Sequence, residues 1–277
     1  MVDTGVVDPK LAGKCRHLFE VLQDLGSVAV AFSGGADSTF LAAAARRVLG
    51  RAESHCITAV SPSLAEREEQ ECRELARALD LRWTPVPTFE MERAAYRTND
   101  PDRCYHCKAE LMDVMIPLAK GASIVLGVNL DDLTDHRPGQ QAARERGAVF
   151  PLVVAEFTKD EIRAVSRAWE LPTWDKPAAA CLASRIPYGT AVSVEILGRV
   201  DRAEAALVDL GFRTVRVRHY GDTARVEVVD LAAAVAARDQ IVAALKGVGY
   251  RYVTLDLEGF RSGNLNHAGS SRSAARP

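Results

Sequence analysis

The segment SGGADS at residues 33–38 combines residue types that can bind a phosphate group. It follows a short apolar run at residues 27–32 and precedes a helical pattern. Gly34 and Gly35 allow positive φ angles and let backbone N–H groups approach an anion without a Cβ in the way. Asp37 or Ser38 can cap the following helix, whose dipole adds partial positive charge at the same point. The order of strand, loop and helix therefore favours phosphate binding over a plain Gly-Gly turn.

The loop lacks the lysine and the glycine spacing of a Walker A motif, and it is not a G-x-G-x-x-G loop. It resembles the PP-loop of the ATP pyrophosphatase family, signature SGGxDS, with Ala36 where a larger apolar residue is common. The resemblance implies that ATP is cleaved between its α- and β-phosphates and that AMP passes to a substrate oxygen. It also implies that Asp37 holds Mg²⁺ or orients the loop, and that the pyrophosphate is held by Ser33, Gly34, Gly35 and Ser38.

Two cysteines, Cys104 and Cys107, form a C-x-x-C pair just before a predicted helix. Such a pair can be a redox dithiol, half of a zinc site or part of an iron–sulfur site, and a helix N-terminus favours thiolates. The sequence has no second C-x-x-C pair, so we do not expect a self-contained four-cysteine zinc site. Two unliganded thiols remain an alternative.

Cys181 lies in the segment KPAAACLASRIPYG at residues 176–189. Arg185 could lower the pKa of this thiol and orient a phosphate or carboxylate. From the residues alone, a buried inert cysteine is an equally good interpretation. The remaining cysteines lie in amphipathic or apolar segments and are expected to be small buried hydrophobic residues: Cys15, Cys56 and Cys72.

Together, several segments resemble the LarE family of sulfur transferases, which build the nickel-pincer nucleotide of lactate racemase, and the resemblance spans about residues 10–266. These segments are DRCYHCK at 102–108, GVNLDD at 127–132, CLASRIPYG at 181–189, VRVRHYG at 215–221 and LDLEGFRSGNLN at 255–266. The resemblance implies that ATP adenylylates a carboxylate of pyridinium-3,5-biscarboxylic acid mononucleotide. A sulfur nucleophile then displaces AMP and leaves a thiocarboxylate.

The resemblance allows two sources of sulfur. In many members the sulfur is a cysteine that matches Cys181, and that cysteine becomes dehydroalanine. In other members, three cysteines that match Cys104, Cys107 and Cys181 hold a [4Fe–4S] cluster that binds an extra sulfide. Because this chain has all three cysteines, the cluster route is favoured over sacrifice of Cys181.

The resemblance also implies which residues contact the substrate. The positions that hold the mononucleotide's phosphate match Ser184, Arg185, Arg216 and Arg218, and an arginine fork suits phosphate. Arg216 and Arg218 are two apart on a predicted strand and therefore share a face, which could instead be the solvent face of a sheet.

The sequence also offers acidic residues as candidate ligands. Glu227 and Asp230 could bind a metal, although solvated carboxylates are equally consistent. Asp131 and Asp132 follow a predicted strand end, where α/β sheets bind ligands, so they could contact ATP or Mg²⁺.

The elements that must position these residues alternate between strand and helix over the first half of the chain. Apolar runs predict strands at residues 27–32, 56–60, 82–87 and 123–127, and amphipathic patterns predict helices at 8–25, 38–49, 64–80 and 107–119. This alternation predicts an α/β fold with a parallel sheet covered by helices on both faces. We assign residues 1–189 to a PP-loop ATP pyrophosphatase domain, with an irregular segment at 171–190.

The pattern changes after residue 190. A helix at 193–210 precedes two alternating strands around Gly221 and Asp222, which indicates a hairpin, and a helix at 230–246 and a strand at 251–257 follow. We therefore predict a small α+β domain at 190–266 and a disordered tail at 267–277.

Composition limits the classes of function. The formal net charge is −2, no apolar run is long enough to span a bilayer, and the start lacks the order of a secretory signal. We therefore expect a cytoplasmic enzyme with a small-molecule mononucleotide substrate and no nucleic-acid or membrane partner. The cofactors expected from the resemblance are ATP, Mg²⁺ and a [4Fe–4S] cluster. By analogy with the family we also expect a homo-oligomer, with lactate racemase maturation proteins as possible partners.

Three other functions are compatible with the loop. The strongest is an iron–sulfur-dependent tRNA thiolase, but residues 190–277 carry nearly equal numbers of basic and acidic residues rather than a basic stripe. An ammonia-using amide synthetase would not need the three cysteines. A non-catalytic nucleotide-binding regulator would bind ATP without releasing pyrophosphate.

Overall fold

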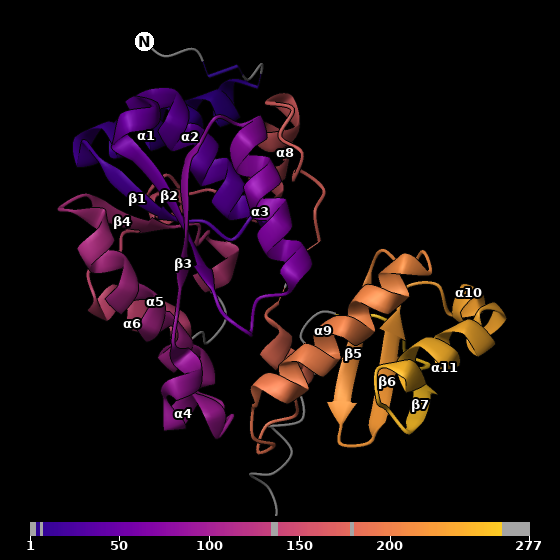
Figure 1. The fold of residues 1–277 in the computed structure, drawn as a ribbon. Coiled ribbons are helices and arrows are strands. Elements are labelled where there is room, and N and C mark those ends of the chain that lie inside the picture. The colour runs from indigo at the N-terminus through magenta and orange to yellow at the C-terminus, as the bar shows by residue number, and fades with distance from the viewer. Residues whose placement is uncertain (1–3, 6–7, 134–137, 178–179, 262–277) are drawn as a thin grey trace, which may run out of the picture. The chain divides into compact units, whose positions relative to one another are not determined.

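The computed structural model describes residues 4–5, 8–133, 138–177 and 180–261 (Figure 1). It divides into two compact units. The first comprises residues 1–61, 66–96 and 101–179, and the second comprises residues 62–65, 97–100 and 180–277. The second unit thus takes two short pieces from the N-terminal half of the chain. The predicted tail at 267–277 lies outside the described residues.

The described part of the first unit is built on a parallel sheet in the order β3-β2-β1-β4. Its strands are β1 (Val28–Ala31), β2 (Ser54–Val60), β3 (Arg82–Pro87) and β4 (Ser123–Leu126). Val30 in β1 is level with Cys56 in β2 and Val125 in β4. In this order β2 and β3 lie on one side of β1, and β4 lies on the other. The direction in which strands are added therefore reverses, and the switch point of the sheet lies between β1 and β4. Ligands of such sheets bind outside the carboxyl ends of the strands at the switch point.

Helices cover both faces of this sheet because alternate strand residues point to opposite sides. Val28 and Val30 join the core under α1 (Pro9–Leu25), α2 (Ala36–Glu53), α3 (Glu66–Ala78) and α8 (Lys159–Ala168). Ala29 joins the core under α5 (Arg103–Ala119) and α6 (Pro138–Glu145). Figure 1 shows α1 and α2 on one side of the sheet and α5 and α6 on the other. The shorter elements are η1 (Glu90–Glu92), α4 (Ala94–Arg97), η2 (Asp131–Leu133) and α7 (Pro151–Val154).

The second unit contains a separate sheet in the order β5-β6-β7. Strands β5 (Val215–Tyr220) and β6 (Thr223–Val228) form an antiparallel hairpin, and β7 (Tyr252–Leu255) pairs parallel to β6. The accompanying helices are η3 (Leu182–Arg185), α9 (Val194–Asp209), α10 (Leu231–Ala236) and α11 (Arg238–Gly247). Alternate strand residues such as Val217 and Val226 pack against Ala203 and Leu207 of α9.

The predicted α/β class, with a parallel sheet and a small additional α+β sheet, is confirmed. The predicted helix at 230–246 is divided into α10 and α11, and the predicted irregular segment at 171–190 contains the short helix η3. The helices of residues 138–168 were not predicted. Among the described helices, none combines the length and the apolar composition that crossing a bilayer requires.

Candidate functional site

The predicted phosphate loop, residues 33–38, lies between the end of β1 and the first turn of α2 in the first unit. Gly34 has a φ of 65°, in the left-handed region that favours glycine. Gly35 is the N-cap of α2, and no side chain caps this helix end, so the expectation that Asp37 or Ser38 caps it is wrong. The hydroxyl of Ser38 instead stays inside the loop, where it donates to the carbonyl of Gly35 (3.2 Å) and accepts from the N–H of Ser33 (3.3 Å).

This arrangement leaves backbone donors at the start of α2 without acceptors. No described residue accepts a hydrogen bond from the N–H groups of residues 34–38. They lie at the positive end of α2, whose helical backbone is unbroken from its first residue as far as a kink at Gly50, next to the carboxyl end of β1. A helix N-terminus of this kind is a ready site for an anion, which would supply the missing acceptors.

Two glycines allow the neighbouring elements to press directly against the loop. A Cβ on Gly34 would lie 2.8 Å from Sγ of Cys72 on α3. A Cβ on Gly127, just after β4, would lie 2.9 Å from the backbone nitrogen of Ser38. The loop is therefore held between α3 and the end of β4, and both glycines are required by close packing.

Carboxylates lie around the first turn of α2. Burial raises the pKa of Asp37 above its ordinary value, and the Asp132 carboxylate acts in the same direction, while Lys159 opposes them. Oδ1 of Asp37 is buried and makes no hydrogen bond of standard geometry among the described residues, although the Asn129 amide is close enough to lower the pKa of the carboxyl. Oδ2 of Asp131 instead accepts from the N–H of Lys159 (2.6 Å), at the start of α8. Asp37 therefore offers a ligand a buried carboxylate oxygen next to the first turn of α2.

The site includes residues that we did not predict. Asn129 is fully buried beside the loop, and its side-chain amide is close enough to Asp37 to lower the pKa of that carboxyl, although it makes no hydrogen bond of standard geometry among the described residues. Lys176 donates from Nζ to the carbonyl of Gly34 (3.0 Å). The segment GVNLDD contains Asn129 and the segment KPAAAC contains Lys176, but nothing in either segment indicates contact with the loop.

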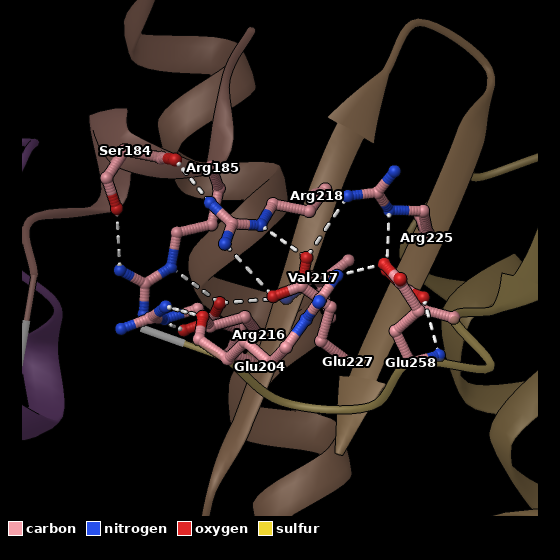
Figure 2. A network of polar contacts seen from close by, with 11 residues as sticks. Ser184, Arg185, Glu204, Arg216, Val217, Arg218, Arg225, Glu227 and Glu258 are labelled. Atoms are coloured by element: carbon pink, nitrogen blue, oxygen red, sulfur yellow. Dashed lines mark hydrogen bonds and ion pairs between the residues drawn. The ribbon is translucent and has the colours of Figure 1, made fainter. Parts of the chain in front are cut away.

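In the second unit, the four predicted phosphate contacts come together in one polar network (Figure 2). Arg185 donates to both oxygens of Glu204 (2.8 and 2.9 Å) and to the hydroxyl of Ser184 (3.0 Å). Arg218 donates to both oxygens of Glu227 (2.9 and 3.0 Å) and to the carbonyl of Ser184 (2.8 Å). The guanidinium groups of Arg185 and Arg218 are thus already paired with carboxylates.

Arg216 differs from these two arginines. It is buried, and among the described residues it forms no ion pair with a carboxylate; Nη1 donates to the carbonyl of Arg261 (3.0 Å), and the guanidinium lies 4.4 Å from the ring centre of Phe260. Burial, together with the charges of Arg185 and Arg218, lowers the pKa of Arg216. The alternative that Arg216 and Arg218 lie on a solvent face is therefore wrong. Arg216 is the cation of this network best placed to attract an anion.

Glu227 has a different environment from the one expected of a metal ligand. It is fully buried, and Oε1 accepts from both Arg218 (2.9 Å) and Arg225 (3.2 Å). Within the described ranges, no group of three or more His, Cys, Asp or Glu side chains is placed to hold a metal ion. Metal binding by Glu227 stays a prediction. In this structure its carboxylate pairs with arginine side chains.

The three candidate cysteines are divided between the units. Cys104 is exposed and Cys107 is partly exposed, and both lie within the first five residues of α5. Cys181 is partly exposed and precedes η3 in the second unit, and its carbonyl accepts from Arg185 (3.2 Å). Arg185 therefore joins the turn that carries Cys181 to the arginine network.

Comparison with known proteins identifies relatives over most of the chain, although no family model matches it. The chain is 43% identical over 263 residues to an uncharacterized protein of Synechocystis sp., covering 92% of this chain and 98% of the relative. It is 36% identical over 261 residues to the pyridinium-3,5-bisthiocarboxylic acid mononucleotide synthase of Lactiplantibacillus plantarum, covering 92% and 95%. An uncharacterized protein of Methanocaldococcus jannaschii is 26% identical over 239 residues, covering 85% and 91%.

The similarity to the synthase covers more of the chain than either unit contains, and it exceeds 30% identity over nearly the whole of both proteins. The chain therefore belongs to the LarE family, the family of the pyridinium-3,5-bisthiocarboxylic acid mononucleotide synthase.

Proposed function

We propose that the protein is an ATP-dependent sulfurtransferase that converts the carboxylates of pyridinium-3,5-biscarboxylic acid mononucleotide to thiocarboxylates. The name of the Lactiplantibacillus relative supports the substrate and the product. The observation that carries the ATP-dependent step is the row of N–H groups at residues 34–38 without acceptors, at the N-terminus of α2.

The loop would bind the β- and γ-phosphates of ATP, which leave together as pyrophosphate. A substrate carboxylate would attack the α-phosphorus, forming an acyl-adenylate with AMP as a good leaving group. Backbone N–H groups that are already aimed at the departing charge stabilise it without reorganisation. Asp37, with its buried Oδ1, fits a Mg²⁺ ion, because Mg²⁺ is commonly held by one or two carboxylates together with phosphates and water.

The second unit would hold the phosphate of the mononucleotide. Arg216 would pair with it, since Arg185 and Arg218 already hold Glu204 and Glu227. Ser184 contacts both of these arginines in Figure 2, through its hydroxyl and its carbonyl, and the hydroxyl could donate a further hydrogen bond to the phosphate.

For sulfur transfer we favour the route in which the polypeptide survives. Cys104 and Cys107 are three residues apart on a helix, so their thiols share a face and fit two ligands of a [4Fe–4S] cluster, with Cys181 as the expected third. Such a cluster would supply a sulfide that does not come from the protein. If Cys181 is the sulfur donor instead, its own C–S bond breaks and dehydroalanine remains.

Pyrophosphate release tests the ATP-dependent step. We expect release from ATP and Mg²⁺ only when the dicarboxylic acid mononucleotide is present, with AMP formed in equal amount. Asp37→Asn should abolish release, while Gly13→Ala, at a half-buried position of α1 outside the loop, retains it. Pyrophosphate release without any acid, or none at all, would contradict the proposal.

Intact mass before and after turnover identifies the source of sulfur. An unchanged mass with repeated turnover, and iron and acid-labile sulfide after anaerobic purification, would support the cluster route. A loss of one H₂S from the protein would instead show that Cys181 is consumed. A Cys104→Ala variant that still turned over repeatedly would also contradict the cluster route.

A further inference from the structure

Lys176 makes a contact with the phosphate loop that the chemistry proposed above does not use. Its Nζ lies 3.0 Å from the carbonyl oxygen of Gly34 and 2.6 Å from Oε2 of Glu71 on α3. The backbone of Lys176 is itself fixed, because its N–H donates to the carbonyl of Thr173 (3.1 Å) in a turn. The ammonium group is therefore held at the loop by the Gly34 carbonyl, the Glu71 carboxylate and the turn that contains Lys176.

The carbonyl that Lys176 contacts belongs to the peptide between Gly34 and Gly35, the peptide of the loop that is flanked by two glycines. Gly34 and Gly35 flank this peptide, and glycine accepts positive and negative φ almost equally, so the backbone torsions of these two residues do not themselves oppose rotation of the peptide plane. A trans peptide is planar, so the Gly34 carbonyl and the Gly35 N–H point in opposite directions. Rotation would present a carbonyl oxygen to the ligand in place of an N–H group, and an oxygen would repel phosphate.

Lys176 opposes this rotation by holding the Gly34 carbonyl. Gly35 is the N-cap of α2, so its N–H is one of the donors without an acceptor at the proposed phosphate site. With the carbonyl bound to the ammonium, this N–H is directed to the opposite side. Helix α3 supports the arrangement twice, because Glu71 holds the ammonium and Cys72 packs against Gly34.

We propose that Lys176 is a positioning residue of the phosphate loop, which holds the Gly34 carbonyl away from the nucleotide so that the Gly35 N–H faces the pyrophosphate end of ATP. The inference rests on the proposed function, because it assumes that the loop binds ATP. It assigns Glu71 the task of fixing the Lys176 ammonium, and it does not require Lys176 to touch the nucleotide.

Lys14 provides a matched control. Its Nζ contacts a carboxylate and a backbone carbonyl in the same way, Glu161 at 2.6 Å and Glu156 at 2.6 Å, and it is similarly exposed (18% against 22% for Lys176). Neither contact of Lys14 involves the loop. Replacing either lysine with Met removes one ammonium and keeps most of the side-chain stem.

The test measures binding of ATP, inorganic pyrophosphate and AMP to the full chain by calorimetry, and KM for ATP and kcat for pyrophosphate release. We expect Lys176→Met to weaken ATP and pyrophosphate binding about tenfold or more, the effect of one charge-assisted hydrogen bond. AMP binding should stay unchanged, since AMP lacks the two terminal phosphates. Lys14→Met should leave all three affinities unchanged, and Lys176→Arg should recover part of the loss.

Glu71→Gln separates positioning from direct contact with phosphate. If Lys176 positions the loop, loss of the carboxylate loosens the ammonium and weakens ATP binding. If Lys176 binds phosphate directly, loss of Glu71 releases the ammonium and strengthens ATP binding, which would overturn the inference. Wild-type affinity in Lys176→Met would also overturn it while leaving the proposed function intact. Failure of the wild-type protein to bind ATP would overturn both.

Discussion

Replacing Glu227 with Gln should strongly destabilise the second unit, although the two side chains have nearly the same shape. Glu227 is fully buried, and its oxygens accept from Arg218 at 2.9 and 3.0 Å and from Arg225 at 3.2 Å. Gln keeps one acceptor oxygen but removes the negative charge. Arg218, which is only 2% exposed, would then be a buried cation without a carboxylate, with the charges of Arg185 and Arg216 close by.

Breaking a buried ion pair by removing one partner costs about 3–5 kcal/mol, chiefly because the other charge stays buried. Since Gln retains part of the hydrogen bonding, we expect a loss of about 3 kcal/mol, near the lower end of that range. The double variant Glu227→Gln with Arg218→Met removes both charges and should recover at least about 1 kcal/mol of the loss.

Urea unfolding followed by far-ultraviolet circular dichroism measures these changes. With an m-value of about 1.5 kcal/mol per molar urea, the midpoint should fall by about 2 M. Glu195→Gln is the control, because Glu195 pairs with Arg199 at 3.0 Å but is 79% exposed, and loss of a surface pair costs at most about 0.5 kcal/mol. If Glu227→Gln costs no more than Glu195→Gln, the carboxylate is not buried between arginines and the description of the network is wrong.

Three other changes probe the loop and the second unit. Gly127→Ala places a Cβ 2.9 Å from the nitrogen of Ser38, so we expect its free energy of unfolding to fall by about 1–3 kcal/mol and its ATP binding to weaken. In Gly13→Ala the Cβ meets only the end of the Arg16 side chain at 3.8 Å, so the free energy of unfolding should rise by up to about 1 kcal/mol. Thermal unfolding and ATP titration measure both, and equal stability of the two variants would contradict the close packing. Because the pKa of Asp37 is raised in the folded protein, the unfolded chain loses this proton first as the pH rises, and stability falls above the ordinary value of 3.8. Asp37→Asn should therefore be more stable than the wild type at neutral pH, and this stability difference should vanish below pH 3.8. Urea unfolding at several pH values measures it, and a stability difference that does not change with pH would contradict the prediction. Burial lowers the pKa of His219, so the unfolded chain binds this proton first and stability falls as the pH drops below 6.5. His219→Gln should reduce that slope, and an unchanged slope in the same unfolding series would count against a buried neutral His219.

Local patterns were sufficient for the first sheet and for the loop. Buried parallel strands are short apolar runs, and the residues 27–32 with SGGADS behind them define β1 and the phosphate loop without reference to distant residues. The hairpin of the second unit was equally local, because alternation and the Gly221 turn specify β5 and β6. Helix α8 was missed even though its start carries a local signal, the capping box of Thr158 and Glu161.

Local patterns did not predict that strand β5 is buried on both of its faces. The alternation of valine and arginine in β5 is typical of a strand with one solvent face, yet Arg216 and Arg218 are both buried. Their burial is possible because Glu227 from the paired strand neutralises Arg218, and because Phe260 covers Arg216. Alternation reports where side chains point and contains no information about which distant elements cover them.

The sequence by itself determined the family, the strand–loop–helix unit that can bind phosphate, and the residue types available for the chemistry. Only the tertiary structure decided which of these residues already have partners. Arg185 and Arg218 hold carboxylates, whereas the N–H groups of the loop have no acceptor within the described residues. Lys176 reaches Gly34 across 142 positions of sequence. Helical and strand periodicities act over a few residues, whereas contacts over such separations are set by how the elements pack.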